Sequence, residues 1–191
     1  MRAEPSRTGP LLRIGVVSDT HVPAQLAALP SALLDRLHDV DLILHAGDIA
    51  TLSVLDVLGE LCEVAAVYGN GDGPLVKAHL PSRRLLSCKG RRIGLIHGDR
   101  PRAIEASYTG PLDNYESPAM AKYYDYLTKV LPTAEVIVFG HFHVPLIKTW
   151  NGRMLLNPGA VAHKTQSSFA ILSVSPDDIS AEIVELPPCD G

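Results

Sequence analysis

Five short apolar runs, each ending in polar residues, constrain the fold of this chain more than any other feature. Apolar runs bounded by turn-forming residues are typical of strands that are buried on both faces. The runs are RIGVVSDTH (13–21), DLILHAGD (41–48), EVAAVYGNGD (63–72), RIGLIHGD (92–99) and EVIVFGHFH (135–143). The pattern therefore predicts buried strands that recur along most of the chain.

Helical patterns separate the first three runs, and hairpin signals dominate the C-terminal third. One helix is expected to begin near Ser31, a good N-cap residue, and another at Thr51. This alternation of strand and helix indicates α/β units. Further along, consecutive short strands are joined by turns such as Asn151-Gly152. A partly parallel half followed by an antiparallel half predicts an α/β protein with two stacked mixed sheets and helices outside.

We expect one domain over residues 11–186, with disordered tails at 1–10 and 187–191. Within it, residues 100–132 form the longest interruption between predicted strands and are interpreted as an insertion. Its second part predicts a helix that begins after Ser117, a suitable N-cap. Five of the six tyrosines fall in this segment. Core packing of the helix, a lid over a pocket and a self-association surface are the alternatives for it.

Composition and charge argue against several classes of protein. The net charge of −4 and the pI near 6.0 are unlike those of a dedicated nucleic-acid-binding protein. No apolar run approaches the ~18 residues of a membrane span, and the N-terminus lacks the apolar core of a secretory signal. Three cysteines without C-x-x-C spacing do not suggest a disulfide framework. We therefore expect a cytoplasmic protein with neither a membrane nor a nucleic acid as its partner.

Residues with metal-binding side chains gather just after the carboxyl ends of the predicted strands. This is the edge at which α/β proteins place their ligand sites. A spacing of two, as in Asp-x-His and His-x-His, puts both side chains on the same side of an extended backbone. The candidates are Asp19, His21, Asp48, Asn70, Asp72, His97, His141 and His143. Together they offer a mixed nitrogen and oxygen ligand set, which suits Mn, Fe, Zn, Co or Ni.

In this order, the motifs closely resemble the five signature blocks of the calcineurin-like metallophosphoesterases. The blocks are Asp19-x-His21, Gly47-Asp48, Gly69-Asn70-x-Asp72, His97-Gly98 and Gly140-His141-x-His143. The short length and the NPGA sequence at 157–160 look most like the small bacterial and archaeal phosphodiesterases of that superfamily, which share a fold with a retromer subunit. The resemblance spans residues 13–186 and implies a four-layer α/β/β/α sandwich.

The resemblance also implies the metal ligands and the reaction. The implied ligands of the first ion are Asp19, His21, Asp48 and His143, and those of the second are Asp48, Asn70, His97 and His141. Asp48 would therefore bridge two divalent transition-metal ions, with manganese expected and iron, zinc, nickel or cobalt as alternatives. Two such ions clamp a phosphoryl group and generate a hydroxide nucleophile. The implied reaction is hydrolysis of a small-molecule or nucleotide-like phosphoester, a diester rather than a monoester.

Three residues, Asn70, Asp72 and His141, are expected to take part in catalysis. Asp72 lies too far along the chain to share the metal of Asn70, and we expect it to orient a histidine or solvent. Family members that cleave phosphoesters well often carry a histidine at the position of Gly71, where it protonates the leaving group. The glycine supplies no proton, which predicts a preference for leaving groups that need little protonation. Asp99, which follows His97-Gly98, and His163, which follows the NPGA sequence, are alternative proton donors.

The main rival to an enzyme is a non-catalytic interaction protein that keeps the fold, as the retromer subunit does. The motifs of that subunit are degraded, whereas all seven presumed ligands are intact here, which favours the enzyme. A purely structural metal site conflicts with so many oxygen ligands and the absence of a thiolate. A phosphomonoesterase is the remaining alternative for the reaction. Residues 100–132 would form the contact surface if the protein assembles into a homo-oligomer.

Overall fold

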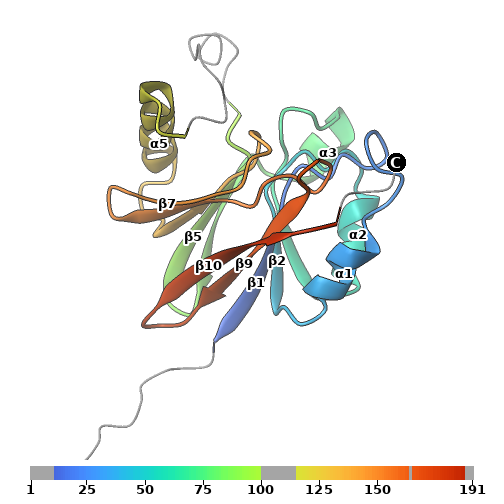
Figure 1. Ribbon diagram of the computed structural model, residues 1–191, viewed down its shortest axis with the longest axis horizontal. Helices are drawn as coiled ribbons and strands as arrows, with labels where there is room; N and C mark the ends of the chain where they lie inside the picture. The colour runs from blue at the N-terminus through green and yellow to red at the C-terminus, as the bar shows by residue number, and fades with distance from the viewer. Residues whose placement is uncertain (1–10, 100–114, 164, 188–191) are drawn as a thin grey trace, which may run out of the picture.

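Two mixed β-sheets lie face to face at the centre of the molecule (Figure 1). The computed structural model describes residues 11–99, 115–163 and 165–187, and in these ranges ten strands form two sheets of five. The first sheet contains, in spatial order, β10 (Ile179–Glu185), β9 (Ser168–Val174), β1 (Leu12–Val17), β2 (Leu42–His45) and β3 (Glu63–Ala66). The second contains β4 (Arg83–Cys88), β5 (Arg91–Ile96), β6 (Val136–Val138), β8 (Arg153–Asn157) and β7 (Leu146–Trp150).

Parallel strands form part of each sheet and bring their carboxyl ends to one edge. Strands β1, β2 and β3 run parallel, and so do β5, β6 and β8. Every residue of β2 and of β6 is buried, as the apolar run of each strand predicts, and β2 ends in the buried His45. The C-terminal hairpins are divided between the sheets, with β7–β8 in one and β9–β10 in the other. Each sheet is therefore mixed, and the antiparallel strands do not form a separate half of the fold.

Helices cover the outer face of each sheet. The helices α1 (Ser31–Leu37) and α2 (Ser53–Gly59) pack against the first sheet through buried leucines and valines. The helix α5 (Pro118–Val130) packs against the second sheet through tyrosines and Leu127. A third apolar cluster, which includes Val16 of β1, fills the space between the sheets. These layers confirm the predicted four-layer α/β/β/α sandwich.

The start of α5 agrees with its sequence signal, because the hydroxyl of Ser117 accepts the N–H of Met120 at 3.2 Å. Both Tyr123 and Tyr124 are buried, so the helix itself packs in the core, which was one of the three alternatives for this segment. The preceding residues 100–114 lie outside the described residues, as do the predicted tail at 1–10 and all but the first residue of the tail predicted at 187–191.

The other helices differ from the expectations in three ways. The helix α2 begins at Ser53 with Leu52 at the N-cap, two residues after the expected start at Thr51. Ser31 is the first residue of α1, and Pro30 occupies the N-cap without a side-chain hydrogen bond. The short helix α3 (Pro74–His79) was not expected. Its proline in the first turn is a helix-start signal, but the turn-forming residues directly before it obscured that signal. The shifted starts of α1 and α2 lie at element boundaries, where local sequence signals are weakest.

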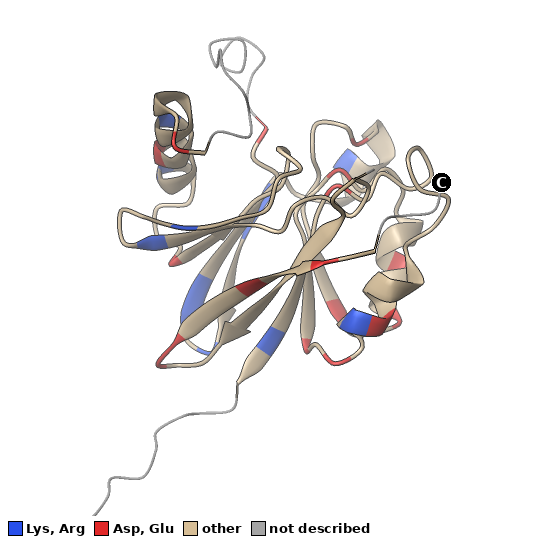
Figure 2. Ribbon diagram, in the orientation of Figure 1, with Lys and Arg blue, Asp and Glu red and all other residues tan. Residues whose placement is uncertain are grey.

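Basic and acidic residues are interspersed over the strands and helices (Figure 2). The β4–β5 hairpin carries several arginines, and two of them have partners within the fold. Arg91 pairs with Glu135 at 2.9 Å, and Arg84 donates to the carbonyl of Ala66 at 3.0 Å. Such arginines join strands to each other, as expected for residues at strand edges. Among the described residues, no helix is both long and apolar enough to cross a bilayer.

Candidate metal centre

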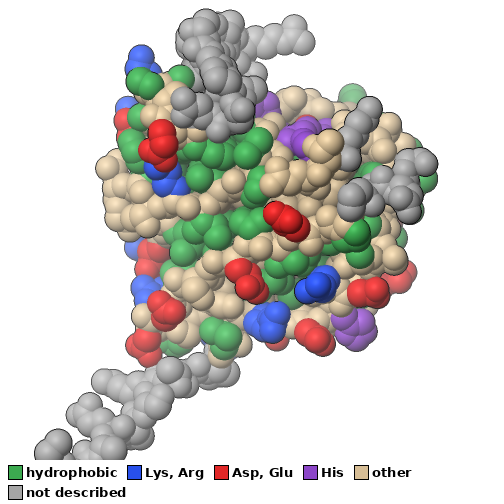
Figure 3. All heavy atoms as spheres, in the orientation of Figure 1, with side chains coloured by type: hydrophobic (Ala, Val, Ile, Leu, Met, Phe, Trp, Pro, Cys, Tyr) green, Lys and Arg blue, Asp and Glu red, His purple; other side chains and the backbone are tan. Residues whose placement is uncertain are grey.

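The seven predicted ligands follow five different strands and meet at one edge of the sandwich. They come from the loops after β1, β2, β3, β5 and β6, and five of their side chains form two groups that share Asp19. Histidine side chains are visible at the surface along the upper edge of the molecule in Figure 3. The ligands are Asp19, His21, Asp48, Asn70, His97, His141 and His143.

The first group consists of Asp19, His21 and His143, whose ligand atoms all lie within 4.8 Å of one another. The Nε2 atom of His143 is 3.1 Å from Asp19 Oδ1, and the Nε2 atom of His21 is 3.9 Å from the same oxygen. His21 Nε2 also lies 3.8 Å from Asp48 Oδ2. One oxygen of Asp48 therefore faces this group.

The second group consists of Asp19, Asp48 and His97, whose ligand atoms also lie within 4.8 Å of one another, and His97 is fully buried. Its Nε2 atom lies 3.5 Å from Asp48 Oδ1 and 3.1 Å from Asn70 Oδ1. His141 reaches the same amide oxygen, with its Nδ1 atom 3.0 Å from Asn70 Oδ1. The two oxygens of Asp48 thus face the two groups separately.

Several of these atoms are placed to bind a cation. His21 Nε2 is buried without a hydrogen-bond partner among the described residues, and such atoms are rare in folded proteins. His97 Nδ1 bonds to the carbonyl of Ala46 at 2.7 Å and therefore carries the proton. In the neutral ring the lone pair of Nε2 then faces two oxygens, Asp48 Oδ1 and Asn70 Oδ1. Divalent ions with a preference for nitrogen and oxygen ligands fit this donor set.

The shifted pKa values of the candidate ligands reflect the negative charge of the carboxylates at this site. Burial alone would lower the pKa of His97, but the carboxylates of Asp48 and Asp19 raise it to about 9. Burial alone would raise the pKa of Asp48, but His97 and the N–H of Gly71 lower it to about 2. The pKa of His143 is also raised, chiefly by its hydrogen bond to Asp19. A proton at His97 and a metal ion would therefore compete for one nitrogen.

The backbone at the ligands is unusual. Five of the seven ligands have left-handed φ values although none is a glycine: Asp19 (54°), His21 (45°), Asp48 (53°), His141 (75°) and His143 (59°). This conformation is uncommon for residues with a Cβ, and such strain clusters at functional sites, where the surrounding structure holds it in place. The positions of these side chains are therefore maintained by contacts outside the ligand set.

Asp72 supplies the first of these contacts. Its two oxygens accept four backbone N–H groups, from Asp48 (3.1 Å), Ile49 (2.9 Å), Ala50 (2.7 Å) and Gly69 (2.8 Å). Asp72 was expected to orient a histidine or solvent, but three of these bonds are to the backbone of the loop that carries Asp48, and the fourth is to its own loop. The segment GNGD is thus a turn and a corner of the candidate metal centre, because Asn70 Oδ1 lies near His97 and His141 while Asp72 fixes the neighbouring loop.

Gly71 lies against the carboxylate of Asp48. Its N–H donates to Asp48 Oδ1 at 2.7 Å, and an added Cβ would lie 2.9 Å from Asp48 Oδ2. The backbone of Gly71 is not in the left-handed region, so closeness rather than φ explains the glycine. From the sequence, only the missing proton donor at this position was apparent, and the contact with Asp48 was not foreseen.

Aromatic residues of α5 support the ligands of the second sheet, a contact that the sequence analysis missed. The ring centroid of Tyr123 lies 4.9 Å from that of Phe142. In the sequence, Phe142 stands between the predicted ligands His141 and His143. The Tyr123 hydroxyl donates to the carbonyl of Gly98 at 3.1 Å, directly after His97. The cluster of tyrosines in the sequence was a signal for an aromatic core but did not show what it would contact.

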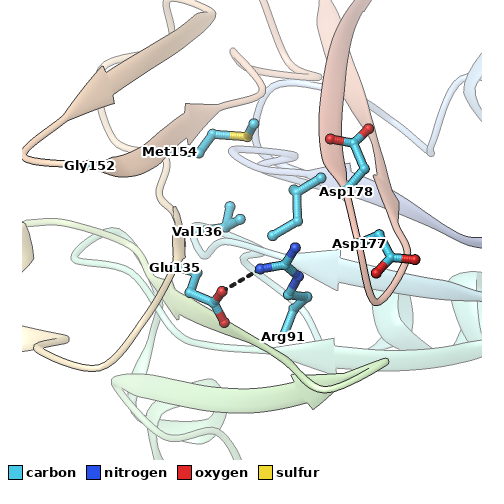
Figure 4. Close-up of a pocket in the computed structure, with 8 residues that line it drawn as sticks. Arg91, Glu135, Val136, Gly152, Met154, Asp177 and Asp178 are labelled. Carbon is cyan, nitrogen blue, oxygen red and sulfur yellow. Dashed lines mark hydrogen bonds and ion pairs between the residues drawn. The ribbon is translucent and has the colours of Figure 1, made fainter.

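A separate cavity of about 260 Å³ lies where β5, β6 and β8 begin, at the opposite end of the sandwich from the ligands. Figure 4 shows Arg91 paired with Glu135 on one side of it and Asp177 and Asp178 of the β9–β10 turn on the other. None of the seven ligands lines this cavity. This cavity is therefore separate from the candidate metal centre.

The fold and the ligand groups define a class of protein, and comparison with known families agrees. The model of the calcineurin-like phosphoesterase superfamily domain matches residues 12–177. This match covers most of the chain, which therefore belongs to the calcineurin-like phosphoesterase superfamily. Membership and the candidate ligand groups together support a metal-dependent phosphoesterase.

Individual proteins are also similar to this chain. A probable metallophosphoesterase of Methanothermobacter thermautotrophicus is 35% identical over 176 residues, which cover 90% of this chain and 91% of that protein. Vacuolar Protein Sorting 29 from Cryptosporidium parvum has a TM-score of 0.68 at 17% identity, covering 92% of this chain and 98% of that one. A novel archaeal phosphodiesterase has a TM-score of 0.66 at 19% identity, covering 92% and 100%. The two structural likenesses show the fold alone.

Proposed function

We propose that this protein is a phosphodiesterase that uses two divalent metal ions shared by one carboxylate. The observation that carries the proposal is the position of Asp48, whose Oδ2 lies 3.8 Å from His21 Nε2 while its Oδ1 lies 3.5 Å from His97 Nε2. A carboxylate that faces two separate ligand groups is suited to bridge two ions.

The residues divide between the ions as their contacts suggest. The first ion would be held by Asp19, His21, Asp48 and His143, and the second by Asp48, Asn70, His97 and His141. When bound, two such ions supply Lewis-acid polarisation of a phosphoryl oxygen and lower the pKa of water to near neutrality. We propose manganese as the metal, with iron, zinc, nickel and cobalt as alternatives, because the ligands are imidazole nitrogens and carboxylate or amide oxygens.

The chain's own residues would bind and orient the substrate. Asn70 is exposed and His141 is half-buried, so both lie on the open side of the centre, where a phosphoryl group can reach them. Asp19 and Asp48 bring only two negative charges to a site for two divalent ions. The loaded centre therefore keeps a positive charge that attracts an anionic phosphoester.

Protonation of the leaving group distinguishes classes of substrate. Gly71 has no side chain to donate a proton, so we propose that esters with good leaving groups, such as phenolates, are cleaved in preference to alkyl esters. His163 is the candidate donor elsewhere in the site. Its Nδ1 accepts the N–H of Gln166 at 3.0 Å, which leaves the proton of the neutral ring on Nε2. The neighbouring Ala162 bonds to the carbonyl of Asp19 at 3.0 Å.

The test is hydrolysis by metal-free protein reconstituted with Mn²⁺, measured on an aryl phosphodiester, an alkyl phosphodiester and an aryl phosphomonoester. We expect activity only with metal, highest on the aryl diester. The variant His163→Gln should reduce hydrolysis of the alkyl ester more than that of the aryl ester, while His79→Gln, at an exposed residue of α3, should change neither. Metal binding without hydrolysis of any ester would instead favour the non-catalytic interaction protein, and preference for the monoester would favour a phosphatase.

A further inference from the structure

A buried histidine that is not a ligand joins two of the ligand-bearing loops. His45 is the last residue of β2 and is completely buried. Its Nδ1 lies 3.2 Å from the N–H of Gly47, and its Nε2 lies 3.1 Å from the hydroxyl of Thr20. That hydroxyl in turn lies 3.4 Å from the carbonyl of Ile49. The imidazole thus bonds to the loop after β1 and to the loop after β2.

The direction of each hydrogen bond follows from its chemistry. A backbone N–H can only donate, so His45 Nδ1 accepts from Gly47 and the proton of the neutral ring lies on Nε2. Nε2 then donates to the oxygen of Thr20, whose own hydrogen is directed to the carbonyl of Ile49. Burial lowers the pKa of His45 to about 3, so the ring is neutral throughout the physiological range. Every polar atom of the ring therefore has one partner and one role.

The partners of His45 flank the ligands on both loops. Thr20 lies between Asp19 and His21, while Gly47 and Ile49 lie on either side of Asp48. These three ligands all have left-handed backbone conformations, which persist only where the surroundings hold them. Two backbone bonds also join the loops, from Asp19 to Gly47 at 3.0 Å and from His21 to Asp48 at 3.1 Å.

Packing alone does not explain a histidine at this place. The other residues of β2, Leu42, Ile43 and Leu44, are apolar and buried, and an apolar residue would continue the strand. A buried polar ring is stable only when its hydrogen bonds are made. We propose that His45 is a positioning residue, which together with Thr20 holds Asp19, His21 and Asp48 in the arrangement that binds metal. The inference rests on the metal binding proposed above.

The test is the metal affinity of variants of the full chain, measured by calorimetric titration of Mn²⁺ into metal-free protein. Thr20→Val keeps the shape of the side chain and removes only the hydroxyl, and His45→Gln keeps an N–H donor near the place of Nε2. His45→Leu removes both bonds of the ring. The control is Val174→Ala in the same sheet, because Val174 is buried and pairs with Leu12 at the start of β1, far from the ligands.

We expect Thr20→Val and His45→Leu to bind Mn²⁺ about 10–100-fold more weakly, as is typical when a residue that orients ligands is lost. His45→Gln should recover part of this loss. Because the two residues act as a pair, the double variant of Thr20→Val and His45→Leu should bind Mn²⁺ about as tightly as whichever single variant binds it less tightly. Val174→Ala should lower the melting temperature of the metal-free protein and leave the affinity within about twofold.

Two results would overturn the inference. Thr20→Val tests the inference even if His45→Leu fails to fold. If Thr20→Val keeps the wild-type affinity for Mn²⁺, His45 and Thr20 have only a structural role. If the losses of the single variants multiply in the double variant, the residues do not act as a pair. A wild-type protein that binds no Mn²⁺ and no Zn²⁺ would contradict the proposed function itself, which distinguishes the two failures.

Discussion

The ligands from the two sheets are held in place by different kinds of contact. On the first sheet, buried polar groups join the loops, with Asp72 accepting four backbone N–H groups and His45 bonding to two loops. On the second sheet, the ligand loops rest mainly on aromatic side chains of α5, chiefly Tyr123 against Phe142, with a hydrogen bond from the buried Asn157 to the carbonyl of Gly140 at 2.9 Å. The polar support is directional, whereas the aromatic support is mainly buried apolar surface.

This difference predicts whether the contacts on each sheet control mainly metal affinity or mainly stability. A hydrogen bond holds a loop at a defined distance and angle, so losing it should change ligand geometry even where the fold persists. Aromatic packing contributes free energy in proportion to buried area, so losing it should first reduce stability. Metal affinity and stability should therefore respond differently to substitutions in the two halves.

The largest effect on stability is expected in the aromatic half. Tyr123→Ala would remove a fully buried ring and should lower the free energy of unfolding by about 3–5 kcal/mol. Tyr123→Phe, which loses only the bond to Gly98, should lower it by about 1 kcal/mol. Chemical denaturation of the metal-free proteins measures both. A loss of metal affinity that exceeds the loss of stability in either variant would contradict the comparison.

A smaller loss of stability, with a larger loss of affinity, is expected for Asp72→Asn. The amide would turn an N–H₂ group towards backbone donors, leaving some unpaired at a cost of about 2–4 kcal/mol. Because the loop of Asp48 would move, metal affinity should fall by about 10–100-fold. Titration with Mn²⁺ and denaturation measure the two effects, and Asp177→Asn, an exposed carboxylate of the β9–β10 turn, is the matched control. An Asp72→Asn protein with unchanged affinity would show that its bonds serve the fold alone.

A pH dependence of stability follows from the pKa shifts. The pKa of His97 is raised from 6.5 to about 9, so its contribution is present below pH 6.5 and is lost as the pH rises through 9. The pKa of His45 is lowered from 6.5 to about 3, so its contribution is lost as the pH falls from 6.5 towards 3. The metal-free protein should therefore be most stable near pH 6.5, with losses on the order of 1–3 kcal/mol on either side.

Bound metal should remove the loss of stability above pH 6.5, because a metal-bound imidazole nitrogen no longer carries a proton. Melting temperatures across this pH range, with and without Mn²⁺, check both statements. A metal-free protein whose stability continues to rise between pH 6.5 and 9 would show that His97 is not held in the negative potential of Asp48 and Asp19.

The smallest effect is expected for Gly71→Ala. The new Cβ would lie 2.9 Å from Asp48 Oδ2 and push the carboxylate aside, so metal affinity should fall about 10-fold, within the range for disturbed ligand support. Gly73→Ala is the matched control, since no atom lies within 4 Å of a Cβ at that position. Equal affinity of the two variants would show that the Asp48 side chain adapts without loss.

Much of the fold and of the site was predictable because its signals are local. Apolar runs that end in polar residues indicate buried strands, and parallel strands bring their carboxyl ends to one edge. This places Asp19, Asp48 and His97 together without any knowledge of side-chain contacts. The hairpin signals were equally local, but they do not specify which sheet a hairpin joins, so the division of β7–β8 from β9–β10 was not foreseen.

The support of the ligands was not predictable for a physical reason. The four N–H groups that bond to Asp72 converge only after Asp48 and Ala50 adopt left-handed conformations. The roles of His45 and Tyr123 likewise depend on residues that are distant in the sequence or on the tautomer of a ring. Spacing indicates which residues share an edge, but it does not show which side chains hold their neighbours in place.

The shared carboxylate of Asp48 is tested most directly by metal stoichiometry. Metal-free wild-type protein and Asp48→Asn would be titrated with Mn²⁺, and bound metal would be counted by elemental analysis, with Asp177→Asn as the control for the same chemical change. We predict about two ions per chain in the wild type and in the control, and at most one in Asp48→Asn. One ion per wild-type chain, or two ions retained by Asp48→Asn, would contradict a carboxylate shared between two metals.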